Sequence, residues 1–148
     1  MSGKTVRIMA LDVGEKRIGV AVSDPLGITA QGIGVIERKG QTRDMEALRQ
    51  LAAKHQVTSL LLGLPRNMNG TLGDKAREVQ EFGKLVEKEL GIPVEYQDER
   101  LSTRAVEGTL IAADVRRRKR RQVIDKLAAV YILQGYLDRK TGNNKSSV

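Results

Sequence analysis

Three separated groups of carboxylates are the side chains in this chain best suited to chemistry. The first is Asp12, which ends an apolar run and is followed by Gly14 and a second apolar run at residues 18–22. This pattern predicts a hairpin with an acid at its tip. A carboxylate there is costly to bury unless it is hydrogen-bonded or binds a ligand. The hairpin alone leaves a metal ligand, a nucleotide contact and an ordinary turn as open interpretations.

Two adjacent acids, Asp98 and Glu99, form the second group and follow a short run at residues 92–97. Neighbouring side chains on an extended backbone point in opposite directions, so one of the two is expected to face Asp12. The other could pair with Arg100 or cap the following helix. The sequence does not decide which acid faces Asp12.

The third candidate is Asp125, at the start of a segment that is apolar nearly all round. Such a helix is expected to be buried, and Ala128 and Ala129 on the face of Asp125 would allow close approach to a sheet. Acids are rarely buried without a partner. An acid near a helix N-terminus is also favoured by the helix dipole, and position alone leaves the two interpretations about even.

Carboxylates gathered at one edge of a sheet would repel one another unless a cation joined them. Their hard oxygen ligands suit Mg²⁺ or Mn²⁺. Two such ions about 4 Å apart would activate water and stabilise the leaving oxygen in phosphodiester hydrolysis. Gly14 and Gly19 would let a phosphate backbone come close to the hairpin.

The elements that must position these acids follow from hydrophobic periodicity and turn residues. The sequence predicts strands over residues 6–12, 17–23, 28–37, 57–62 and 92–97, a loop over 63–70, and helices over 43–55, 72–90, about 103–113 and 122–138. A meander of three strands followed by βαβ units predicts an α/β fold, a five-stranded mixed sheet with helices on its faces. Right-handed crossovers make the fourth and fifth strands parallel to the first. Ligands of such sheets gather at the carboxyl ends of the strands.

Basic residues outnumber acids by 26 to 18, and the run Arg116–Arg121 supplies six positive charges, which leaves +2 for the rest of the chain. Such a run attracts polyanions by counterion release, although it could also be a solvated loop. The four Phe and Tyr side chains are too few for base stacking, so contacts with the nucleic-acid backbone are expected. The candidate contacts are Gly14, Lys16, Arg17, Arg66, Arg100, Arg116, Arg117, Arg118, Lys119, Arg120 and Arg121.

The length of 148 residues fits one domain, residues 1–138, with a flexible tail over 139–148. The sequence has neither an apolar run long enough to span a membrane nor a signal-peptide pattern. Without cysteine, disulfides and thiolate-bound metals are excluded. We therefore expect a cytoplasmic protein with no membrane partner, and a monomer or weak homodimer because nothing marks a dimer face.

Four short motifs occur in a fixed order. They are Leu11-Asp-Val-Gly with Arg17-Ile-Gly-Val-Ala-Val-Ser-Asp24, Gly63-Leu-Pro with Asn69-Gly70, Asp98-Glu-Arg-Leu-Ser-Thr103, and Asp125-Lys-Leu-Ala-Ala-Val. Each is weakly specific alone, but together, over about residues 6–137, they resemble the YqgF (RuvX) family of bacterial RNase H-like proteins. Members are described as pre-16S rRNA nucleases or as Holliday-junction resolvases.

The resemblance implies an RNase H-like fold and a two-metal phosphodiesterase site that uses Mg²⁺ or Mn²⁺. It assigns catalysis and metal binding to Asp12, Glu99 and Asp125, with Asp98 as a lesser metal ligand. The implied activity is processing of the 5′ end of pre-16S rRNA, with Holliday-junction resolution as the alternative. Relatives such as RuvC carry an acid at the end of the fourth strand, where this chain has Gly63-Leu64-Pro65, so an acid of the fifth strand must substitute.

Two other classes of function stay open from the residues. A non-catalytic module would bind pre-rRNA or branched DNA through the basic run without cleaving it. The Asp-x-Gly hairpin also resembles the first phosphate motif of actin-like ATPases, but a single lobe of 148 residues cannot enclose ATP as two lobes do. The single histidine, His55, is expected to be solvated or to cap a helix rather than to act in catalysis.

Overall fold

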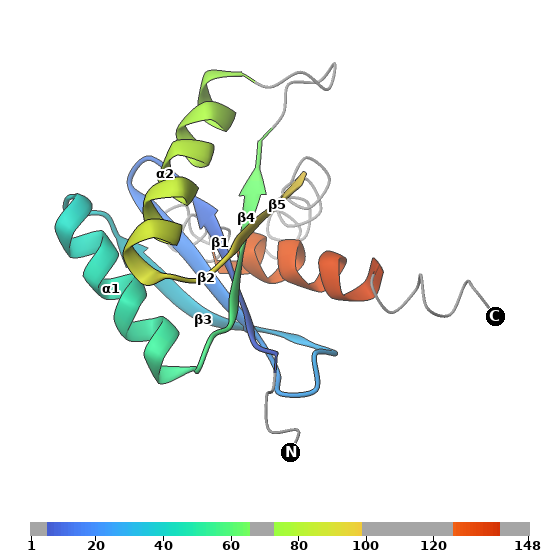
Figure 1. Cartoon of the computed structure of the whole chain (residues 1–148). Helices are drawn as coiled ribbons and strands as arrows, with labels where there is room; N and C mark the ends of the chain where they lie inside the picture. Colours follow the sequence, from blue (N-terminus) through green and yellow to red (C-terminus); the bar gives the residue numbers. More distant parts are fainter. Residues whose placement is uncertain (1–5, 66–72, 99–125, 140–148) are drawn as a thin grey trace, which may run out of the picture.

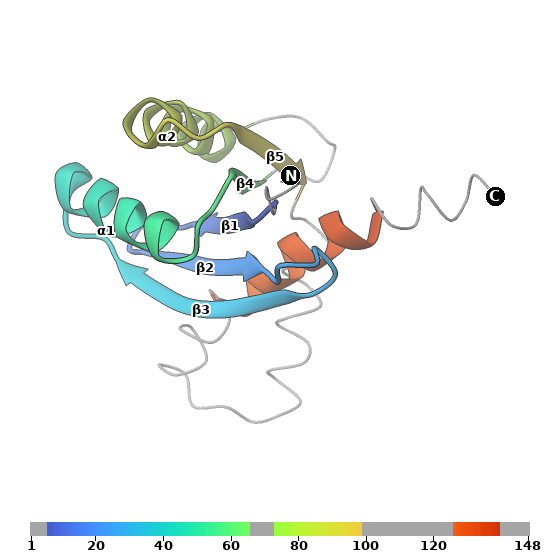
Figure 2. The same cartoon turned by 60° about the horizontal axis from the view of Figure 1, so that its bottom comes forward.

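A five-stranded mixed sheet with helices on both faces forms the structure, a computed structural model that describes residues 6–65, 73–98 and 126–139. The strand order is β3-β2-β1-β4-β5. Helices α1 (Gln41–Lys54) and α2 (Asp74–Leu90) cover one face, and a C-terminal helix over residues 126–139 covers the other (Figures 1 and 2).

The first three strands form an antiparallel meander, and the last two are parallel to the first. The bounds are β1 (Ile8–Val13), β2 (Arg17–Ser23), β3 (Ala30–Glu37), β4 (Ser59–Leu64) and β5 (Val94–Asp98). The predicted mixed sheet and the predicted parallel direction of the fourth and fifth strands are confirmed. The helix predicted after Ser102 or Thr103 lies outside the described residues.

The fourth strand differs from its prediction by two residues at each end. Glycine and proline suggested a loop from residue 63, but β4 continues through Gly63 and Leu64, which pair with Gln97 and Asp98 of β5. The strand continues because β5 pairs with both residues and because Leu64 is buried. A glycine weakens a strand but does not end it where the neighbouring strand pairs with it. The prediction of a loop at Gly63 is therefore wrong, and Gly63 is a strand residue beside β1.

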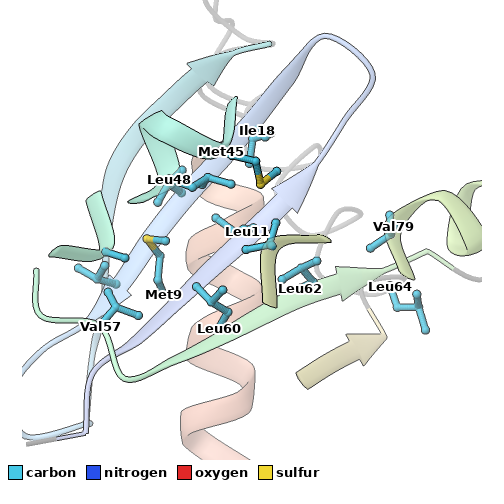
Figure 3. Packing of buried hydrophobic residues seen from close by; sticks show 14 of the residues in the cluster. Met9, Leu11, Ile18, Met45, Leu48, Val57, Leu60, Leu62, Leu64 and Val79 are labelled. Atoms are coloured by element: carbon cyan, nitrogen blue, oxygen red, sulfur yellow. The ribbon is translucent and has the colours of Figure 1, made fainter. Parts of the chain in front are cut away.

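The central strands are buried on both faces, as the apolar runs predicted. Met9, Leu11, Leu60 and Leu62 pack against α1 and α2, where they meet Met45, Leu48 and Val79 (Figure 3). The alternate residues Ile8, Ala10 and Leu61 face the C-terminal helix, where they meet Ala129, Ile132 and Leu133. Alternation along β1 and β4 therefore divides the core into two layers.

Truncation of Leu62 is expected to destabilise the fold strongly. This side chain is fully buried in a central strand, and Leu62→Ala should lower the free energy of unfolding by about 2 to 5 kcal/mol because a cavity is left behind. Urea denaturation measures the change. Leu26→Ala is the control, since Leu26 is 79% exposed and its loss should cost less than about 0.5 kcal/mol. Equal effects of the two substitutions would contradict the buried position of Leu62.

His55 follows the last turn of α1, where its backbone N–H donates to the Leu51 carbonyl at 3.0 Å. The predicted capping position is therefore confirmed. Its Nε2 atom is buried without a hydrogen-bond partner among the described residues. Burial, and then the positive charges of Lys54 and Arg7, lower the pKa of His55 below its usual 6.5.

This lowered pKa predicts a loss of stability in mild acid. The unfolded chain takes up a proton on His55 as the pH falls through about 6.5, whereas the folded chain resists it, so the free energy of unfolding falls with decreasing pH in that window. Urea titrations at about pH 5 and about pH 7.5 should show a smaller difference for His55→Gln than for the natural chain. An identical difference in both proteins would refute the assignment to His55.

Candidate active site

Asp12 lies near the carboxyl end of the central strand β1, between two glycines. It is paired with Gly19 of β2, and the register of Leu11 with Leu62 places Gly63 of β4 on its other side. Neither neighbouring strand therefore sets a side chain directly beside the half-buried carboxylate. The residues directly opposite Asp12 in both neighbouring strands are therefore glycines, which suits close contact with a phosphate or a hydrated cation.

The face to which Asp12 belongs follows from strand alternation. Residues two and four positions earlier, Ala10 and Ile8, pack against the C-terminal helix, so Asp12 lies on the same face. In β5, Gln97 pairs with Gly63 and donates from Nε2 to the Ile132 carbonyl of that helix at 3.0 Å. Asp12 and Gln97 therefore share the face that the C-terminal helix covers (Figure 2).

Asp98 lies on the opposite face. It pairs with Leu64, which is buried in the layer of α1 and α2, and it is two residues from Tyr96, whose hydroxyl donates to the Gln80 carbonyl of α2 at 3.2 Å. The structure therefore does not bring the carboxylate of Asp98 to the side of Asp12. Glu99 is the next residue along the chain and lies outside the described residues.

Most of the other predicted site residues also lie outside the described residues, and their roles stay predictions. They are Asp125, Arg66, Arg100, Arg116, Arg117, Arg118, Lys119, Arg120 and Arg121. Of the three predicted catalytic ligands, the described ranges contain Asp12. Within those same ranges no three His, Cys, Asp or Glu side chains gather into a group that could hold a metal ion.

The C-terminal helix, whose described part begins at Lys126, is fixed on the sheet by two side-chain amides. Gln134 accepts from the Ala30 N–H and donates to the Ile28 carbonyl, both at 2.9 Å, while Gln97 holds the Ile132 carbonyl from the other edge. A Cβ atom at Gly32 would lie 3.0 Å from Lys126 Cγ, so the glycine allows this close packing. These contacts of Gln97 and Gln134 could not be predicted from the sequence, because an isolated glutamine carries no local signal of a long-range contact.

The turn after Asp12 brings three of the predicted nucleic-acid contacts, Gly14, Lys16 and Arg17, to the same end of the sheet. The Gly14 N–H donates to the Arg17 carbonyl at 2.9 Å, and a Cβ atom at Gly14 would lie 2.9 Å from that oxygen. Gly14 therefore closes the turn tightly. Lys16 is exposed at its tip and Arg17 is half-buried at the start of β2.

The sheet order β3-β2-β1-β4-β5 is that of an RNase H-like fold. RuvC of T. thermophilus in complex with a Holliday junction substrate shares the fold, with a TM-score of 0.58, 15% identity, and coverage of 93% of this chain and 96% of that one. The Fowlpox virus resolvase, solved with substrate Holliday junction DNA, gives a TM-score of 0.57 at 11% identity, with coverage of 91% and 99%. At these identities the likeness establishes the fold.

Residues 6–139 match the RuvX family, described as Holliday junction resolvase, and the chain belongs to this family. A relative from Heliobacterium modesticaldum is 58% identical over 135 residues, which is 91% of each chain. A relative from Clostridioides difficile is 58% identical over 134 residues, 90% of this chain and 95% of that one. Both carry the provisional name pre-16S rRNA nuclease. The family and the fold that the four motifs implied are thereby confirmed.

None of the helices in the described ranges is both long and apolar enough to cross a membrane.

Proposed function

We propose that this protein is a divalent-metal-dependent nuclease that hydrolyses phosphodiester bonds during processing of the 5′ end of pre-16S rRNA. The observation that carries the proposal is the position of Asp12, half-buried at the carboxyl end of the central strand and flanked by Gly19 and Gly63. Ligands of open α/β sheets bind at this end of the strands. The names of the relatives support the choice of substrate.

The residues around Asp12 fit a hard divalent cation. A carboxylate supplies the oxygen ligand that Mg²⁺ and Mn²⁺ prefer, and the residues directly opposite it in the neighbouring strands are glycines, which allow close approach. When bound, the cation would supply Lewis-acid stabilisation and activation of water. In this proposal Asp12, Glu99 and Asp125 hold it, and Gln97 and Gln134 hold the helix that follows Asp125.

Glu99, the residue that follows β5, is the acid that we propose as the partner of Asp12. Alternation along β5 places Gln97 on the Asp12 face and Asp98 on the other, so the acid one residue beyond Asp98 is the better placed of the two. The fourth strand contributes Gly63 beside Asp12 in place of an acid. The fifth strand therefore has to provide the second carboxylate.

The substrate is tested by offering two nucleic acids in parallel. A precursor RNA that contains the 5′ end of 16S rRNA and a four-way DNA junction should each be incubated with the purified protein and Mg²⁺ or Mn²⁺. We expect cleavage of the RNA that a chelator abolishes. Cleavage of the junction alone would favour resolvase activity, an alternative that the shared fold with RuvC supports. Binding of both without cleavage would favour a non-catalytic module.

The basic run is expected to contribute to binding rather than to cleavage. Replacement of Arg117, Arg118 and Arg120 by Ala should weaken RNA binding and lower the slope of log Kd against log salt by about 2, because three phosphate contacts are lost. The matched control replaces three exposed cations of α2, Arg77, Lys84 and Lys88, by Ala. Equal slopes of log Kd against log salt in the two triple variants would show that the basic run does not contact the RNA phosphates.

A further inference from the structure

Arg38, which follows β3, is bonded twice to the turn that connects β1 to β2. Its backbone N–H donates to the Lys16 carbonyl at 2.9 Å, and its Nη1 donates to the Gly14 carbonyl at 2.7 Å. Gly14 is two residues after Asp12. One residue therefore holds both ends of the three-residue turn, Gly14 to Lys16, that follows the proposed metal ligand.

The other side of the Arg38 guanidinium is fixed by α1 and α2. Its Nε lies 3.4 Å from Asp44 Oδ2, and the Asp44 side chain is only 3% exposed. Asp44 is itself immobilised, because its Oδ1 accepts from the Lys39 N–H at 3.0 Å and its own N–H donates to the Gly40 carbonyl at 2.9 Å. The guanidinium carbon also lies 5.1 Å from the centre of the Phe82 ring.

We propose that Arg38 is a positioning residue that fixes the turn after β1, and through it the carboxylate of Asp12, without binding the nucleic acid itself. The inference rests on the proposed nuclease function. An arginine bonded at once to a turn carbonyl and a buried carboxylate, with its guanidinium carbon over an aromatic ring, has its Nη1 and Nε donors engaged within the protein. Lys16, exposed on the same turn, stays available for phosphate.

The geometry requires arginine rather than a positive charge alone. The Nη1 and Nε donors diverge, so that one reaches the turn and the other reaches α1, while the flat group lies against Phe82. A lysine ammonium is a single point on a flexible stem and cannot make these contacts together. Catalytic groups have to be held within about 0.5 Å of their working positions, so a loosened turn is expected to impair turnover.

The test uses Arg38→Lys together with the double variant R38M/D44N. A single Arg38→Met substitution would leave Asp44 buried without its charged partner and could unfold the protein, whereas the double variant removes both charges. In both variants we expect kcat for RNA cleavage to fall by about 10- to 100-fold, with Kd for the RNA unchanged. Arg43→Met is the matched control, because it removes an exposed cation from the first turn of α1 and should leave kcat unchanged.

Hydrogen exchange supplies a readout that does not depend on activity. Exchange of the Gly14 amide, whose N–H closes the turn, should accelerate about 10-fold or more in the double variant while the α2 amides keep their rates. If the natural chain cleaves no substrate, the nuclease proposal fails, but the exchange result still decides the role of Arg38. Unchanged exchange and kcat in the double variant would overturn the inference. A weaker Kd with unchanged kcat would also overturn it and make Arg38 a nucleic-acid contact.

Discussion

Asp12→Asn is expected to abolish RNA cleavage while nucleic-acid binding is retained. The substitution keeps the shape of the side chain but removes the negative charge that would hold a divalent cation at the end of β1. Loss of one ligand should lower kcat by at least about 100-fold, since metal ions supply several kcal/mol of transition-state stabilisation. Single-turnover cleavage measures kcat, and a filter-binding titration measures Kd in the same buffer.

Asp24→Asn is the matched control for this prediction. Asp24 follows β2 at the opposite end of the sheet, where its Oδ1 accepts from the Ile28 and Thr29 N–H groups at 2.7 and 3.0 Å. The same change of charge there should leave kcat unaltered. If Asp12→Asn cleaves as fast as the natural chain, either the activity belongs to a contaminant or the assignment of Asp12 is wrong.

The second large effect is expected from Glu99→Gln and not from Asp98→Asn. Asp98 belongs to the face that α1 and α2 cover, since its partner Leu64 is buried in that layer, whereas Asp12 belongs to the other face. Glu99→Gln should therefore lower kcat by about 100-fold or more, and Asp98→Asn should stay within a few-fold of the natural chain. The two neighbouring acids serve as controls for each other, because each variant removes one negative charge at nearly the same place.

The two variants, Glu99→Gln and Asp98→Asn, also show on which face of the sheet the metal binds. Loss of activity in Asp98→Asn with full activity in Glu99→Gln would place the metal on the face of α1 and α2 and would contradict the proposed site. Melting temperatures of both variants should accompany the kinetics. A variant that has merely unfolded would then be recognised.

Much of the fold could be predicted because its signals are local. The apolar runs and the switch from alternation to helical spacing identified the strands and both α1 and α2, and the crossover rule gave the direction of β4 and β5. The end of β4 was predicted two residues too early, because Gly63 and Pro65 are typical of loops. Whether a glycine ends a strand depends on its neighbours in the sheet, and Gly63 has Gln97 of β5 as its partner.

The site could be predicted only in part for the same reason. The hairpin that carries Asp12 could be predicted, and an extended backbone predicts that Asp98 and Glu99 point apart, but only the register with β4 shows which face Asp98 takes. Contacts between distant segments had no sequence signal. Arg38 reaches Gly14 across 24 positions, and Gln134 reaches Ala30 across 104.

The shared fold with RuvC does not by itself assign the chemistry, because one fold can host different functions. In this chain Asp12 has glycines beside it in both neighbouring strands, Gly19 of β2 and Gly63 of β4. In the proposed site the carboxylates that join Asp12 come from Glu99 and Asp125. The C-terminal helix and the residues after β5 are therefore the decisive elements of the proposed site.

In the proposed site Asp12 binds a divalent cation on the sheet face covered by the C-terminal helix. Paramagnetic broadening of backbone amide signals by Mn²⁺ tests it most directly, because broadening reports distance from the bound ion whatever the substrate is. The strongest loss of signal should occur at Val13, Gly19 and Gly63, should spare the last turn of α1 and the Asp24 turn, and should disappear in Asp12→Asn. Broadening centred on any other part of the chain, or the same pattern in Asp12→Asn, would contradict the account.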